Sequence, residues 1–326
     1  MLSIVRQQNV HMMPIPTPFA VGPVNCYLIE DDPLTLIDPG PNSGDSLDAL
    51  EHQLAQLGHS IDDIELLILS HQHIDHLGLI NIVANRSGAE VACLNYCVPF
   101  LENYEEEAIA DDQFASDTMI LHGIAPEVAR ALRSVSAAFR SWGSSAHVDR
   151  VLHDGDVIEL RDRKLEVSWR PGHSQSDTTF WDPEARTLVA ADHLIKHISS
   201  NPLMARSRGG GERIQALVAY DASMEMTRNV PAQLVLSGHG EPIEDHVKLI
   251  DDRLKGRKKR TEKIYRLIAE QQRSAHALAQ ATWGNIAVTQ AYLTLSEILG
   301  HADIMLNEGR IEEVRVGDHI EFRAVA

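Results

Sequence analysis

The segment 70–78 reads SHQHIDHLG and lies between two apolar runs, LLIL at 66–69 and LINIV at 79–83. It holds three histidines and an aspartate, and such side chains are costly to bury unless something satisfies them. A metal ion would do so. On a strand of period two, His71 and His73 point to the same side, while Asp75 and His76 fall at the start of the next helix. The spacing therefore predicts two neighbouring divalent ions, the first bound by His71 and His73 and the second by Asp75 and His76.

The segment resembles the HxHxDH signature of the metallo-β-lactamase superfamily, and further ligand positions of that family recur downstream in the family's order. They are His173 in PGHS, Asp192 in VAADH and His239 in SGHG, each after an apolar run. The resemblance covers roughly residues 9–245. It implies that His71, His73 and His173 hold the first ion, that Asp75, His76 and His239 hold the second, and that Asp192 bridges both.

The same resemblance implies an α+β fold, the αββα sandwich, with the metals at one edge of two packed sheets. It also implies that Asp38, in LIDPG, supports the metal site from behind the ligands. A turn residue before Pro39 and Gly40 is an equally good account of Asp38. In the segment that follows, Ser43 is expected to cap a helix and Gly58 to end it.

Two domains are expected, a catalytic domain at 1–245 and a C-terminal domain at 246–326. The second, three helices and a closing hairpin, resembles the winged-helix-like domain of related hydrolases. Residues 98–147 are expected to be a helical insertion that covers the site, although an insertion that only packs on the sheet edge is the alternative. The candidate pocket residues are Tyr104, Phe114, Met119 and Trp142 in this cover, with Lys196 and His197 in the loop after Asp192. Either of the last two, taken singly, is also explained as a solvated loop residue.

Charge and cysteine content bear on partners and location. The net charge of −18 is a poor match to nucleic acid or to an anionic membrane surface. Three cysteines, Cys26, Cys93 and Cys97, do not make a disulfide framework, so a reducing cytoplasm is expected. The N-terminal sequence indicates neither a signal peptide nor a membrane span.

The expected activity is that of a dinuclear hydrolase in which a metal-bound hydroxide attacks a small ester-like substrate: an ester, thioester, lactone or organophosphate. Asp75 or Asp192 would pass a proton to the leaving group. The imidazole-rich set favours Zn²⁺, with Mn²⁺ and Fe²⁺ as alternatives. The alternative function is a metal-dependent endoribonuclease or another nucleic-acid-binding protein, and a homo-oligomer is left open.

Overall fold

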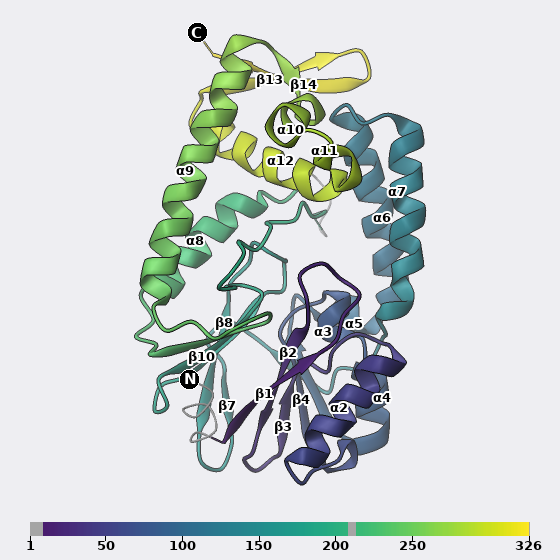
Figure 1. Ribbon diagram of the computed structural model, residues 1–326, viewed down its shortest axis with the longest axis vertical. Coiled ribbons are helices and arrows are strands. Elements are labelled where there is room, and N and C mark those ends of the chain that lie inside the picture. The colour runs from purple at the N-terminus through teal and green to yellow at the C-terminus, as the bar shows by residue number, and fades with distance from the viewer. Residues whose placement is uncertain (1–8, 208–212, 326) are drawn as a thin grey trace. The chain divides into compact units, whose positions relative to one another are not determined.

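The computed structural model describes residues 9–207 and 213–325 (Figure 1). By its contacts the chain divides into two compact units, each assembled from three stretches of sequence. The first unit contains the described residues of Met1–Ala108, Phe139–Ser200 and Arg228–Val247. The second contains those of Ile109–Ala138, Asn201–Thr227 and Lys248–Ala326.

The first unit is built on two mixed sheets. In spatial order, the six-stranded sheet consists of β1 (Val10–Ile15), β2 (Val24–Ile29), β3 (Thr35–Ile37), β4 (Leu66–Leu69), β5 (Glu90–Leu94) and β6 (Arg150–Leu152). The five-stranded sheet consists of β11 (Leu234–Ser237), β10 (Thr187–Ala191), β9 (Thr178–Asp182), β8 (Lys164–Trp169) and β7 (Val157–Glu159). Strands β3 to β6 run parallel, as do β10 and β11, while the other neighbouring pairs are antiparallel.

Strand β4 shows how the two faces of a sheet are used. Its four residues are all buried, but alternate side chains enter different cores because a strand has a period of two. Leu66 and Ile68 join an apolar core that also contains Phe180 of the other sheet, so the two sheets pack face to face. Leu67 and Leu69 join a second core, under the helices.

The helices of the first unit include α2 (Gly44–Gln56) and α4 (Ile80–Ser87), whose apolar faces enter the second of these cores. Helix α2 begins and ends as predicted. The Ser43 hydroxyl accepts a hydrogen bond from the backbone N–H of Ser46, and Gly58 lies beyond the end of the helix with a φ of 85°. Two short helices, α3 (Ile74–Leu77) and α5 (Val98–Glu102), and the 3₁₀ helices η1 (Ile61–Asp63) and η2 (Arg140–Trp142) also belong to this unit.

The second unit is mainly helical. Its helices are α6 (Tyr104–Leu121), α7 (Pro126–Phe139), α8 (Ala216–Arg228), α9 (His246–Glu270), α10 (Ala275–Trp283), α11 (Ile286–Thr289) and α12 (Ala291–Asn307). The end residues of α6, α7, α8 and α9 that adjoin the first unit in sequence are counted with that unit. A three-stranded sheet follows the order β12 (Arg273–Ser274), β14 (His319–Ala324) and β13 (Ile311–Val316). Arg213 and Asp303 form a largely buried, bidentate ion pair in this unit.

The contact units differ from the domain boundary expected at residue 245. Most of α6 and α7, expected from the sequence to be a cover within the catalytic domain, groups with the C-terminal segments. The reason is shared burial, because Met119 and Ile124 enter the same apolar core as Leu295 and Phe322. The winged-helix-like character of 246–326 stays a prediction. Among the described residues, no helix is long and apolar enough to cross a membrane.

Candidate metal centre

The histidine-rich segment lies where β4 ends and α3 begins, as the sequence predicts. His71 follows β4 after Ser70, His73 is the N-cap of α3, and Asp75 and His76 belong to the helix itself. Ser70 is anchored by Asp38, whose carboxylate accepts hydrogen bonds from the Ser70 backbone N–H at 2.8 Å and from its hydroxyl at 2.6 Å. The strand therefore ends at a fixed point from which the first two histidines project.

The other three expected ligands follow strands of the second sheet. His173 comes after β8, Asp192 directly after β10, and His239 after β11. Because β10 and β11 are parallel, their carboxyl ends meet at one edge of the sheet. The backbone N–H of Thr178 donates to the carbonyl of Ser70, which ties this edge to the end of β4.

The structure brings all seven residues together. Their ligand atoms form three overlapping groups, each with all its atoms within 4.8 Å of one another. The groups are His71, His73 and His173; His71, His76 and Asp192; and Asp75, His76 and His239. The first and third match the two triads that the family resemblance implies. The middle group joins them, since it takes one histidine from each triad together with Asp192.

Asp192 lies between the two triads. One carboxylate oxygen is 3.4 Å from Nε2 of His76, and the other is 3.5 Å from Nε2 of both His173 and His239. A carboxylate with nitrogens of both triads around it has the position that a ligand shared by two ions requires.

Burial and charge act in opposite directions on the site's histidines. Burial lowers the pKa of His71 well below its ordinary value, and burial together with His173 lowers the pKa of His73 to about 3. Burial also opposes the charged form of His76 and His239. There, however, the neighbouring Asp192 prevails, helped by Asp38 at His76, so the pKa of His76 rises well above its ordinary value and that of His239 rises to about 9.

The donor set fits divalent metal ions. Within the described part of the chain, Nε2 of His76, Nε2 of His239 and Oδ1 of Asp192 are buried and make no hydrogen bond. The opposite ring nitrogens are held: Nδ1 of His76 lies 2.8 Å from Asp38, and Nδ1 of His239 lies 2.9 Å from the carbonyl oxygen of Pro23. Metal-binding histidines characteristically use one ring nitrogen in this way and present the other to the ion.

Asp38 is almost completely buried, and its backbone has a φ of 58°, which Asp and Asn adopt more readily than most residues. From there it contacts Ser70 behind the first triad and His76 in the second. These contacts support the role behind the ligands that the family resemblance implies.

Sequence reasoning missed the residues that hold the His239 turn. The Asn25 side-chain amide donates to the backbone carbonyls of Ser237 and Gly240, at 2.9 Å in each case. The hydroxyl of Tyr27 donates to the same Ser237 carbonyl at 2.6 Å. No local signal could reveal these contacts, because more than 200 residues separate the partners.

Gly238 was also missed. A Cβ at this position would lie 2.1 Å from Oδ1 of Asp192, far inside any real contact. The backbone N–H of Gly238 donates to the carbonyl of Ala191, the residue before Asp192, at 2.7 Å. The glycine thus lets the His239 turn pass directly over the carboxylate that lies between the triads.

The candidate pocket residues are spread over both units. In the first unit, the Tyr104 hydroxyl donates to the carbonyl of Arg140, and Trp142 is half-buried. In the second, Met119 is buried in the apolar core and Phe114 packs against it. Their role as pocket walls stays a prediction.

The two candidates in the loop after Asp192 lie beside the His239 turn. Lys196 forms an ion pair with Glu241 at 2.8 Å. The exposed ring of His197 lies so close to Gly240 that a Cβ there would be 2.7 Å from its Nδ1. Both residues therefore help to join the Asp192 loop to the His239 loop, and their contact with substrate stays a prediction.

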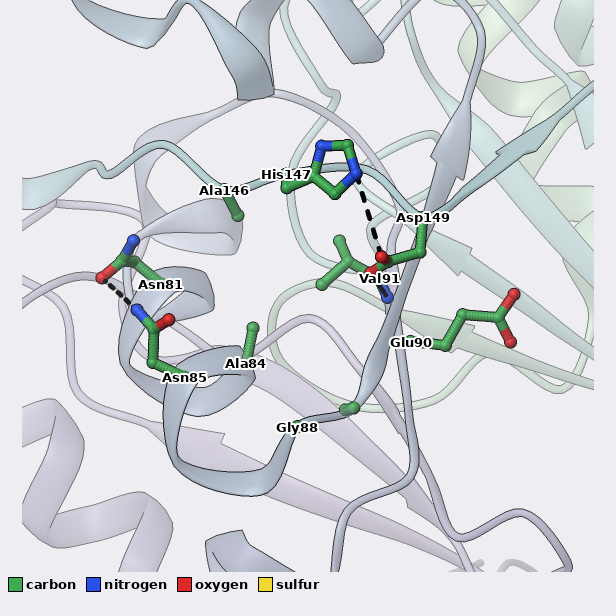
Figure 2. Close-up of a pocket in the computed structure, with 10 residues that line it drawn as sticks. Asn81, Ala84, Asn85, Gly88, Glu90, Val91, Ala146, His147 and Asp149 are labelled. Atoms are coloured by element: carbon green, nitrogen blue, oxygen red, sulfur yellow. Dashed lines mark hydrogen bonds and ion pairs between the residues drawn. The ribbon is translucent and has the colours of Figure 1, made fainter.

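A separate hollow of about 400 Å³ lies on the first unit (Figure 2). It is lined by Asn81, Ala84, Asn85, Gly88, Ala89, Glu90, Val91, Ala146, His147 and Asp149. Gly88 and Glu90 lie at the amino end of β5, whereas the expected ligands His71, His73, Asp75 and His76 follow the carboxyl end of its parallel neighbour β4. The hollow is therefore at the opposite edge of the sheet and takes no part in the metal chemistry.

Comparison with known proteins agrees with this geometry. A family model described as the metallo-beta-lactamase superfamily matches residues 20–239. The "Probable metallo-hydrolase YqjP" of Bacillus subtilis (strain 168) is 28% identical over 318 residues, which cover 98% of each chain.

Two solved structures share the fold over almost the whole chain. A metallo-beta-lactamase family protein from Thermus thermophilus has a TM-score of 0.80 at 23% identity, covering 97% of this chain and 99% of that one. A beta-lactamase domain protein from Burkholderia ambifaria has a TM-score of 0.84 at 20% identity, covering 97% and 92%.

The close approach of Gly238 gives a first prediction. Gly238→Ala should displace the Asp192 carboxylate, so the purified variant should hold at least one ion fewer per chain than the wild type after reconstitution with Zn²⁺. Elemental analysis measures this directly. Gly44→Ala is the matched control, because a Cβ at Gly44 meets nothing within 4 Å and should leave metal content unchanged. Equal metal content in Gly238→Ala and the wild type would contradict the prediction.

Asp38 gives a second prediction. Asp38→Asn tolerates the same backbone conformation but removes the charge that orients His76, so Zn²⁺ affinity should fall by about 10- to 100-fold, as is usual for such outer partners. Competition with a chromophoric chelator measures the affinity. Asp32→Asn removes an exposed acid that pairs with Arg161, and it should bind Zn²⁺ like the wild type. An affinity for Asp38→Asn equal to that of the control would show that Asp38 is only a turn residue.

Proposed function

The chain belongs to the metallo-beta-lactamase superfamily and is a metal-dependent hydrolase, and we propose that it cleaves a small ester-like substrate using two divalent ions. The position of Asp192 between the triads is the observation that carries the proposal. His71, His73 and His173 would hold one ion, Asp75, His76 and His239 the other, and Asp192 both. The preponderance of imidazole ligands favours Zn²⁺ over Mn²⁺ or Fe²⁺.

When bound, two such ions would lower the pKa of a water molecule and polarise the carbonyl or phosphoryl oxygen of the substrate. The protein's own residues position the substrate and transfer protons. Asp75 is the better placed of the two aspartates to do this, because Asp192 lies between both triads and would be engaged by both ions. A carboxylate oxygen of Asp75 can accept the proton of the attacking water and return it to the leaving oxygen. Asp192 would mainly keep the two ions together.

Features of the sequence narrow the substrate class. An aspartate stands at position 192, where zinc β-lactamases of the commonest subclass have a cysteine, so β-lactam hydrolysis is not the proposed activity. The stretch 193–197 lacks the tyrosine that is typical of acyl-homoserine lactonases. The net charge of −18 disfavours polyanions such as RNA. The classes that remain are esters, thioesters, organophosphates and lactones whose binding does not need that tyrosine.

The test is hydrolysis of a panel containing an aryl ester, a thioester, a lactone and a phosphotriester by protein reconstituted with Zn²⁺. We expect turnover of at least one of these and loss of that turnover in Asp192→Ala, because no other carboxylate in the described part of the chain lies between both triads. Circular dichroism checks that the variant is folded. Wild-type turnover by Asp192→Ala with two ions per chain would contradict the bridging role, and efficient cleavage of single-stranded RNA at physiological salt would favour the endoribonuclease alternative.

A further inference from the structure

Three aromatic side chains meet at one place in the first unit. Phe19 belongs to the loop 16–23 between β1 and β2, while Phe139 and Trp142 belong to the segment that ends the helical insertion. The ring of Phe19 lies 5.8 Å from that of Phe139 and 6.3 Å from that of Trp142, centroid to centroid, with tilted planes in both pairs. These are favourable geometries for aromatic pairs. We call these three residues the aromatic wall.

The aromatic wall is not a fully buried core. Phe139 is 38% exposed, and Phe19 and Trp142 are only half-buried. Each therefore keeps apolar surface in contact with water. A cluster whose only task was to pack the loop against the helical segment would gain most by burying that surface.

The loop that carries Phe19 is held in a fixed shape. The backbone N–H of Phe19 donates to the Thr17 hydroxyl oxygen, and that hydroxyl donates to the carbonyl of Gly22. The N–H of Gly22 donates in turn to the carbonyl of Phe19, with a φ of 97° that favours glycine. Pro16, Pro18 and Pro23 restrict the loop further. Phe19 is thus presented in place before any ligand arrives, which lowers the entropy cost of binding.

The two segments that carry the aromatic wall each contact a part of the second triad. On the Phe19 side, the loop ends at Pro23, whose carbonyl oxygen lies 2.9 Å from Nδ1 of His239, and Val24 pairs with His239 itself.

On the Trp142 side, η2 packs against α3, the helix of Asp75 and His76. The residue just after that helix, Gly78, has no room for a Cβ, which would lie 2.3 Å from the Trp142 carbonyl oxygen. The Ser144 hydroxyl also donates to the Gly78 carbonyl at 2.7 Å. The segments that carry the aromatic wall are therefore joined to the turn of His239 and to the helix of Asp75 and His76.

We propose that the aromatic wall binds a ring-sized apolar group of the substrate while the substrate's carbonyl group lies at the metal centre. The proposal rests on the proposed function, since it names the part of the substrate that lies beside the same site. Phe19, Phe139 and Trp142 offer no polar side-chain atom except the indole N–H, so they discriminate by apolar area and ring contacts. Substrates with a ring or a comparable apolar group next to the scissile ester are preferred over acetyl esters.

The test uses binding, so that it does not depend on turnover. Full-length protein loaded with Zn²⁺ is titrated calorimetrically with 3-phenylpropionate and with acetate, two carboxylates that differ in the apolar group. The wild type should bind 3-phenylpropionate at least about tenfold more tightly, as expected when a ring is buried against aromatic side chains. In Phe19→Ala and Trp142→Ala the ratio of the affinity for 3-phenylpropionate to the affinity for acetate should fall toward one. The affinity for acetate and the metal content should stay unchanged.

Conservative variants separate recognition from folding. Phe19→Leu and Trp142→Phe keep apolar area and should retain most of the ratio, even if an alanine variant fails to fold. Val157→Ala removes an apolar side chain of similar exposure on the edge strand β7 and should leave the ratio at its wild-type value.

Two outcomes overturn the proposal. They are a wild-type ratio near one, and a wild-type ratio that persists in folded, metal-loaded Phe19→Ala and Trp142→Ala. Failure of the proposed function has a different signature. If none of the panel is hydrolysed but the ratio falls in the alanine variants, the aromatic wall stands and the ester-like substrate class is wrong. If esters are hydrolysed but the affinity ratio is the same in both alanine variants as in the wild type, the role of the aromatic wall is wrong and the hydrolytic function stands.

Discussion

The first unit is arranged around one buried carboxylate, which meets histidines from separate segments of the chain. Asp192 faces His76, His173 and His239, which come from three different connections between strands. Such a cluster is costly to bury without an ion, because ring nitrogens and a carboxylate oxygen are left without hydrogen bonds. The two sheets serve this arrangement by bringing the ends of β4, β8, β10 and β11 to one place.

Much of the surrounding structure holds the expected ligands from behind. Asp38 joins the end of β4 to His76, Asn25 and Tyr27 fix the turn before His239, and Gly238 leaves room for Asp192. The histidines respond to this setting in two ways. Burial lowers the pKa of His71 and His73, which favours the neutral form that binds a cation. The Asp192 carboxylate beside His76 and His239 raises the pKa of both histidines above its ordinary value despite burial.

Local features and features that belong to a known motif are predictable from the sequence. The superfamily and the α+β class are confirmed, and the strand, turn and short helix around 70–78 lie where the spacing of His71, His73 and Asp75 places them. The cap at Ser43 and the end near Gly58 were also predictable, because each depends on neighbouring residues. The contacts of Asn25 and Phe19 were not, because their partners lie far away in the chain. Likewise, the apolar residues of α6 indicate burial, but they do not reveal that Met119 packs with the C-terminal helices.

Anomalous diffraction can show whether the seven side chains form one centre for two ions. Crystals of the full chain reconstituted with Zn²⁺ would be measured on both sides of the zinc absorption edge. We expect two neighbouring anomalous peaks, one among His71, His73 and His173 and the other among Asp75, His76 and His239, with the Asp192 carboxylate bound to both. A single peak, or two peaks of which neither contacts Asp192, would contradict it.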